Sequence, residues 1–181
     1  VSSDSDEILN IAFDYSNNII PIERPYELSN DIIMPDNAVT HALKTASEKI
    51  GYLPELTTFL QPTSPIRRVE DIINCNKLLE DGIYRSVVSV HKGHDFYWTK
   101  SNNGGYEPSY KNKRPRRQDF FSFIENGSIY VTQTKGFLEN NNRVVEKTTI
   151  YEIPQEYSYQ IDTMLDLEWL ELVGIKIKNA K

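Results

Sequence analysis

The stretch from Leu56 to Arg68, LTTFLQPTSPIRR, constrains the fold more than any other part of the sequence. Its first five residues are the β-branched and apolar residues of a short buried strand. Residues Val69 to Leu79 carry apolar side chains at helical spacing, so the chain passes here from a strand through a polar loop into a helix. In an open α/β sheet, ligands bind at such a junction, outside the carboxyl end of a strand.

Two prolines stiffen this loop, and its polar residues are Gln61, Thr63, Ser64 and Arg67. Each proline fixes one φ angle and restricts the residue before it, so the loop loses little entropy when it holds a ligand. A plainer alternative is that Ser64 caps the next helix and Pro65 is its first residue. Capping explains the Ser-Pro pair and leaves Gln-Pro-Thr unexplained, so we predict a ligand-binding loop.

The order of the remaining elements predicts an α/β fold with three layers and a mostly parallel sheet. Strand patterns at the N-terminus, at residues 56–60 and at residues 86–90 alternate with helix patterns, which requires right-handed crossover connections. The sequence SVVSV at residues 86–90 is typical of a strand that is covered on both faces. We expect one domain, because 181 residues fit a single core of ordinary size.

Helix boundaries follow from capping patterns. Asp4 and Glu7 have the spacing of a capping box, and so do Thr163 and Asp166. A third helix is expected from about Asp36 to Ile50. The first helix is expected to bury Ile8, Ile11, Ala12 and Tyr15, and the last to bury Leu167, Leu170 and Val173.

Composition limits the partners and the compartment. The net charge of -6 argues against nucleic-acid binding. The basic run KNKRPRR at residues 111–117 needs a separate explanation, of which a solvated loop is the plainest. No apolar run approaches membrane-spanning length, and the N-terminus lacks the pattern of a signal peptide. A single cysteine, Cys75, cannot form an internal disulfide. We therefore expect a cytoplasmic protein without membrane contact.

Residues 91–127 form a long excursion between two strands. Loops of this length inside a compact domain are usually functional or reach a partner. The excursion is rich in aromatic residues and has no expected core of its own, so we predict that it is a dimerisation arm of a homodimer. The aromatic side chains that need a covering surface are Phe96, Trp98, Phe120, Phe121 and Phe123.

Five stretches, in order, resemble signatures of the acylneuraminate cytidylyltransferases. They are VSSDSDEI, ERPYELSND, LQPTSPIRR, RPRRQD with ENGSIYV, and QIDTMLDLE. The resemblance implies a Rossmann-like nucleotide-sugar-transferase fold. It also implies an enzyme in which the anomeric hydroxyl of a 2-keto acid sugar attacks the α-phosphate of CTP and releases pyrophosphate with the help of Mg²⁺. The protein then acts by positioning and charge neutralisation, and we assign no catalytic acid or base.

The resemblance also implies roles for single residues. Arg24 matches a nucleotide-binding position, and Gln61, Arg116 and Tyr130 match sugar-binding positions, with one residue of uncertainty between Arg116 and Arg117. Asp162 matches a metal ligand. From the residues alone, the arginines could be solvated, the Asn-Gly pair a hairpin turn and Asp162 a helix-entry residue. The predicted substrate-binding residues are Arg24, Gln61, Thr63, Ser64, Arg116, Arg117, Gln118, Asn126 and Tyr130.

Departures from the family pattern leave alternatives open. Gln160 stands where the family usually has a second metal-binding aspartate, so weaker metal binding is expected. Tyr97, Arg143 and Val144 also depart from the pattern, which leaves the sugar open among neuraminic, legionaminic and pseudaminic acids. The chain begins after the family's phosphate loop, so we expect an N-terminally truncated domain. The alternatives are a non-catalytic remnant that keeps the sugar-binding edge, and a cytidylyltransferase for an eight-carbon 3-deoxy sugar.

Overall fold

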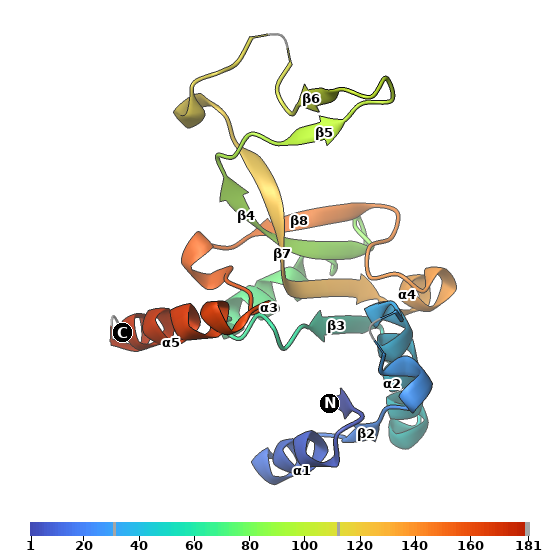
Figure 1. Ribbon diagram of the computed structural model, residues 1–181. Coiled ribbons are helices and arrows are strands. Elements are labelled where there is room, and N and C mark those ends of the chain that lie inside the picture. The colour runs from blue at the N-terminus through green and yellow to red at the C-terminus, as the bar shows by residue number, and fades with distance from the viewer. Residues whose placement is uncertain (31, 112, 180–181) are drawn as a thin grey trace. The chain divides into compact units, whose positions relative to one another are not determined.

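The computed structural model describes residues 1–30, 32–111 and 113–179, with side chains as far as residue 172. Strands and helices alternate as far as β4 (Ser86–Gly93), as an α/β fold requires (Figure 1). The chain divides into two compact units, and all four strands of its largest sheet contribute residues to both. The first unit consists of Val1–Phe59, Ile72–Val88 and Ile129–Thr149, and the second consists of Leu60–Asp71, Ser89–Ser128 and Ile150–Lys181.

The first unit begins with a parallel pair of short strands, β1 (Ser2–Ser3) and β2 (Ile22–Glu23). Helix α1 (Asp6–Tyr15) connects them, and none of its residues is buried. The predicted buried stripe of this helix is therefore wrong, because Ile8 is 50% exposed and Ile11 is 64% exposed. Helical spacing identified the apolar face of α1 but not what covers it.

The N-terminal cap of α1 differs from the prediction by one residue. The side chain of Ser5 accepts a hydrogen bond from the main-chain amide of Ile8 at 3.4 Å. The capping box of Asp4 and Glu7 is therefore wrong. The carboxylate of Asp4 lies 3.1 Å from the guanidinium of Arg24 instead.

Helix α2 (Pro35–Ile50) follows the short helix η1 (Tyr26–Leu28) and confirms the predicted third helix. Proline is suited to its first position because the amide that proline lacks has no partner inside a helix. The helix ends at Gly51, which has a left-handed φ of 82°.

A four-stranded sheet has the order β3 (Leu56–Leu60), β7 (Ser122–Gln133), β4 (Ser86–Gly93) and β8 (Thr148–Glu152). The first five residues of β4 are all buried, which confirms the prediction for SVVSV. Helix α3 (Val69–Lys77) lies between β3 and β4 in sequence, and α4 (Thr134–Asn140) follows β7 directly.

The sheet is mixed. The main-chain amide of Arg85 donates to the carbonyl oxygen of Lys147, and that of Ile153 donates to Val90 further along both strands. β4 and β8 are therefore parallel. The arrows of β3 and β7 in Figure 1 point in opposite directions, so β7 runs against β3. The α/β class predicted from the sequence is confirmed.

The predicted arm lies inside the second unit, where β5 (Trp98–Lys100) and β6 (Tyr106–Pro108) form an antiparallel pair. The ring of Phe96 lies 4.9 Å from Phe120 and 5.3 Å from Tyr110, measured between centroids. Phe96 and Phe120 therefore contact each other within the arm, and both are half-buried. The aromatic residues of the arm that stay exposed include Trp98, Phe121 and Phe123.

The C-terminal part of the second unit contains the short helix η3 (Gln155–Tyr157) and α5 (Met164–Asn179). The main-chain amide of Asp166 donates to the Thr163 hydroxyl at 3.3 Å, and the Thr163 amide donates back to the Asp166 carboxylate at 2.7 Å. This capping box is confirmed, as is the burial of Leu170. The side chain of Val173 lies outside the described residues.

Among the helices described, none is long and apolar enough to cross a membrane.

Candidate functional site

The loop after β3 is closed by hydrogen bonds to its own main chain. The carbonyl oxygen of Gln61 accepts from the amide of Ser64 at 3.2 Å and from the guanidinium of Arg67. Ser64 is buried, and its hydroxyl donates to the carbonyl oxygen of Asn126 at 3.4 Å. The alternative in which Ser64 caps the next helix is wrong, because α3 begins only at Val69.

Asn126 joins several segments of the second unit. It is 2% exposed, and its side-chain oxygen accepts from the Ser89 hydroxyl at 2.7 Å and from the Ser128 amide at 3.2 Å. Its side-chain nitrogen donates to the hydroxyl of Ser158 at 3.2 Å. Its carbonyl oxygen accepts from Nε2 of Gln160. Asn126 therefore holds the site together, and direct contact between Asn126 and a ligand stays a prediction.

Gly127 lies inside β7, so the alternative of an Asn-Gly hairpin turn is wrong. Its φ of 66° is in the left-handed region that favours glycine. Nε2 of Gln160 and Oε1 of Gln61 both lie within 3.0 Å of the point that a Cβ of residue 127 would occupy. Only glycine leaves room for these two side chains.

The loop before α5 meets the loop after β3. The main-chain amide of Ile161 donates to the carbonyl oxygen of Thr63 at 2.8 Å, and Gln160 reaches Asn126 as described. The structure thus brings together Gln61, Thr63, Ser64 and Asn126 with the residues that precede Asp162. This convergence of loops was expected from the topology.

Arg67 is a functional candidate to which the sequence pattern assigned no role. Its Nε donates to the carbonyl oxygen of Ser128 at 3.1 Å, and it has no ion-pair partner among the described residues. Burial lowers the pKa of Arg67, although an arginine stays charged in proteins. The only signal in the sequence was its place in the polar loop, because both its partners are main-chain groups.

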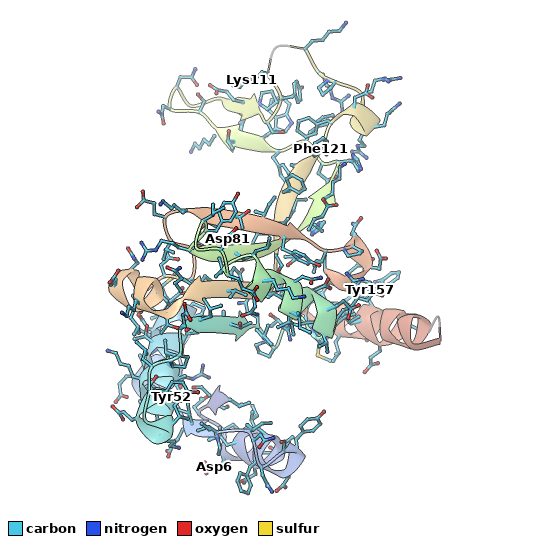
Figure 2. All side chains as sticks on the ribbon, turned by 180° about the vertical axis from the view of Figure 1, so that it is seen from behind. Asp6, Tyr52, Asp81, Lys111, Phe121 and Tyr157 are labelled. Atoms are coloured by element: carbon cyan, nitrogen blue, oxygen red, sulfur yellow. The ribbon has the colours of Figure 1, made fainter. Side chains whose placement is uncertain are left out.

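The next residue, Arg68, fixes the far end of the loop. Its guanidinium pairs in bidentate fashion with Asp71, at 2.7 and 2.8 Å. The hydroxyl of Tyr151 donates to the same carboxylate at 3.1 Å, and the guanidinium stacks 4.7 Å from the ring of Tyr157, which is labelled in Figure 2. Asp71 is 1% exposed, so this network anchors the first turn of α3.

Arg116, Arg117 and Gln118 belong to the second unit but are exposed, at or beside the short helix η2 (Arg117–Asp119). Arg116 pairs with Asp119 at 2.6 Å. Within the described part of the chain, no hydrogen bond joins these three residues to the loops around Asn126. Their substrate-binding roles stay predictions.

Arg24 and Tyr130 belong to the first unit. Nε of Arg24 donates to the hydroxyl of Ser29 at 3.1 Å. Tyr130 is 4% exposed, and the guanidinium of Arg143 lies 5.0 Å from the centre of its ring. Both residues are thus held by neighbours within their own unit, and their roles toward a substrate stay predictions.

Asp162 is exposed immediately before α5, and its main-chain amide donates to the carboxylate of Asp166 at 3.1 Å. Among the described residues, no three His, Cys, Asp or Glu side chains form a group that could hold a metal ion. Asp162 can therefore contribute a single carboxylate. Magnesium sites beside phosphates need only one or two, because water and phosphate oxygens complete the octahedron.

No family model matches the chain. The chain is 30% identical over 177 residues to N-acylneuraminate cytidylyltransferase B of Danio rerio, an alignment that covers 93% of the chain. This chain is a homologue of the N-acylneuraminate cytidylyltransferases. Form A of the same fish is 36% identical over 116 residues, or 61% of the chain, and the Escherichia coli O18:K1:H7 relative is 27% identical across the whole chain. The resemblance in the five stretches is confirmed.

This cytidylyltransferase homologue spans less than half the length of those curated relatives: 39% of form B, 26% of form A and 42% of the bacterial protein.

Solved structures confirm the fold. A 4-diphosphocytidyl-2C-methyl-D-erythritol synthase from Anaerococcus prevotii matches with a TM-score of 0.64 and 13% identity, covering 93% of this chain and 73% of that one. A CMP:2-keto-3-deoxy-manno-octonic acid synthetase, solved with CTP, matches with a TM-score of 0.63 and 12% identity, covering 99% and 80%. At such low identity these matches speak for the fold alone.

Proposed function

We propose that the protein to which this chain belongs activates a sialic-acid-like 2-keto acid sugar with CTP. In this reaction the anomeric oxygen of the sugar forms a bond to the α-phosphorus of CTP. The bond from that phosphorus to the bridging oxygen of the β-phosphate breaks, pyrophosphate leaves, and the proton of the anomeric hydroxyl is released to solvent. The observation that carries the proposal is the homology along 93% of the chain, together with the assembled loops around Asn126.

The chain's own residues act here by binding and orienting. Gln61, Thr63 and Ser64 form the loop that would face the sugar, because amide and hydroxyl groups both donate and accept hydrogen bonds. Arg67 adds a positive charge that no described carboxylate neutralises, which suits an anionic substrate. Arg24 is proposed for the nucleotide and Arg116 or Arg117, with Gln118, for the acidic sugar.

Magnesium is the proposed cofactor, and Asp162 is the residue that would hold it together with phosphate oxygens. When bound, the ion supplies neutralisation of phosphate charge. The exposed carboxylate of Asp162 fits this role, whereas Gln160 carries no charge and donates its side-chain nitrogen to the carbonyl oxygen of Asn126.

A homodimer remains part of the proposal. Trp98 is 58% exposed and Phe121 is 52% exposed, so the arm still presents apolar surface that a second copy could cover. Analytical ultracentrifugation at micromolar concentration tests this, and a monomer alone would contradict it. The cytoplasmic location stays a prediction from the single cysteine.

Pyrophosphate release tests the proposed function. The complete gene product is incubated with CTP and Mg²⁺ and with each of several sugars, namely N-acetylneuraminic, legionaminic and pseudaminic acids and an eight-carbon 3-deoxy 2-keto acid. We expect release with a nine-carbon sugar. Release with the eight-carbon acid alone would favour the related cytidylyltransferase. Sugar binding without any turnover would favour the non-catalytic remnant.

A further inference from the structure

We propose that Gln160 is a positioning residue for the sugar, because it decides which end of the Gln61 amide faces the ligand. The inference rests on the proposed function and deepens it. The resemblance placed Gln160 only as a replacement for a metal-binding aspartate. The structure gives this side chain a different partner, on the same side of the site as Gln61.

The orientation of the Gln160 amide follows from its partner. Its amide group has one nitrogen, which can only donate, and one oxygen, which can only accept. The carbonyl oxygen of Asn126 can only accept, so the bond between them requires the nitrogen of Gln160 at this position. The rotation of the Gln160 amide is therefore fixed by a main-chain group.

The orientation of Gln160 in turn affects that of Gln61. Nε2 of Gln160 and Oε1 of Gln61 both approach the space left by the missing side chain of Gly127, the latter at 2.7 Å from the Cβ point. A nitrogen with hydrogen atoms attracts a carbonyl oxygen and repels an NH2 group. Gln160 therefore favours the amide rotation in which the oxygen of Gln61 points toward Gly127 and its nitrogen points away.

The side chain of Gln61 remains available to a ligand. The structure records no hydrogen-bond partner for the side chain of Gln61 within the described residues, and its main chain is held by Arg67. An amide that favours this orientation, with a free NH2 group, is a ready donor to a hydroxyl or carboxylate oxygen of the sugar. Such preorganisation removes the cost of ordering the side chain on binding.

A carboxylate could not replace Gln160 in this role. Aspartate would be shorter and could not donate to Asn126, which would keep only the 3.4 Å bond from Ser64 at that oxygen. Its negative charge would also repel Oε1 of Gln61. Glutamine in place of the family's aspartate thus gives residue 160 a role in positioning the sugar instead of a role in binding the metal.

Variants of Gln160 test this inference with two readouts. Gln160→Met keeps the approximate shape and removes the donor, and Gln155→Met is the matched control at an exposed glutamine of η3. In the complete gene product we expect Gln160→Met to raise the KM for the sugar two- to tenfold. The KM for CTP and the Mg²⁺ concentration at half-maximal rate should stay unchanged. An unchanged sugar KM would overturn the proposal.

The second readout needs no turnover. The side-chain NH2 signals of Gln61, assigned with Gln61→Ala, are compared by proton-nitrogen NMR in this chain. We expect two well-separated proton signals in wild type that move toward the values of a free glutamine in Gln160→Met. If the gene product turns over no sugar, the proposed function fails, and the NMR comparison of the Gln61 signals alone tests the positioning role of Gln160. Identical Gln61 signals in both proteins would overturn the positioning role.

Two further variants make the outcome decisive. Gln160→Glu removes the same donor and serves if Gln160→Met does not fold. Gln160→Asp restores the family residue. We expect Gln160→Asp to raise the sugar KM at least as far as Gln160→Met does. A lower Mg²⁺ requirement with an unchanged sugar KM would show that residue 160 belongs to the metal site, and it would overturn the proposal.

Discussion

The main-chain amide of Ile161 donates a hydrogen bond to the carbonyl oxygen of Thr63 at 2.8 Å. This bond joins the loop before α5 to the loop after β3. The candidate metal ligand Asp162 and the candidate sugar ligand Gln61 each lie within two residues of it. Their separation is thus set by the main chain.

Asp162→Asn should abolish most turnover of the complete gene product and leave its fold intact. Asparagine keeps the shape of the helix entry but loses the charge that would bind Mg²⁺. Pyrophosphate release across a range of Mg²⁺ concentrations measures the effect, with circular dichroism as the test of folding. Near-normal turnover at limiting Mg²⁺ would leave Asp162 as a structural residue only.

Gly127→Ala should destabilise the chain by more than the cost of its left-handed backbone, which is about 1–2 kcal/mol. A methyl group at residue 127 must also displace Gln61 and Gln160. Gly104→Ala is the matched control, because Gly104 has a φ of 88° and no atom within 4 Å of its Cβ point. Urea unfolding of both variants measures the difference. Equal losses of stability would show that the clash of the methyl group with Gln61 and Gln160 costs nothing.

Arg143→Met should cost about 3–5 kcal/mol of unfolding free energy, because it leaves the carboxylate of Asp36 buried without its partner. The pair is bidentate, and its side chains are only 13% and 8% exposed. The matched control is Arg116→Met, whose ion pair with Asp119 is 72% and 49% exposed and should cost less than about 1 kcal/mol. Similar urea midpoints for the two variants would contradict this ranking.

The pair of Asp4 and Arg24 predicts a pH dependence at acid pH. The hydrogen bond from Arg24 lowers the pKa of Asp4, so the folded state binds the proton less well than the unfolded state does. This contribution to stability is present above the unfolded pKa of about 3.9 and is lost as pH falls through the folded pKa.

Arg24→Gln should raise the pKa of Asp4 toward its ordinary value and flatten the acid limb of the unfolding curve. Carbon NMR of the Asp4 carboxyl group, titrated from pH 2 to pH 6, measures the shift. Asp14→Asn, on the adjoining helix α1, is the control for a general effect of charge. An unchanged Asp4 titration in Arg24→Gln would show that the pair does not persist in solution.

Local patterns predicted the elements well where the cause was local. The capping box of Thr163 and Asp166 and the buried strand SVVSV depend on neighbours in sequence, and both were found. The Asn-Gly pair misled because a left-handed glycine serves a turn and also a close approach within a strand. Local sequence alone could not separate the two.

The site itself depends on contacts that no local pattern encodes. Ser64 looked like a helix cap, yet its hydroxyl bonds to Asn126, far away in sequence. Arg67 binds two carbonyl oxygens, and any residue type can supply those. The apolar face of α1 was found, but periodicity cannot say what covers a face.

The steady-state kinetics of Gln61→Ala test the central claim most directly. Pyrophosphate release by the complete gene product is measured while the sugar and CTP are varied in turn, for wild type and variant. Losing one or two hydrogen bonds of about 0.5–1.5 kcal/mol each should raise the KM for the sugar several-fold and leave the KM for CTP unchanged. An unchanged KM for the sugar with a raised KM for CTP would place Gln61 on the nucleotide and contradict the account.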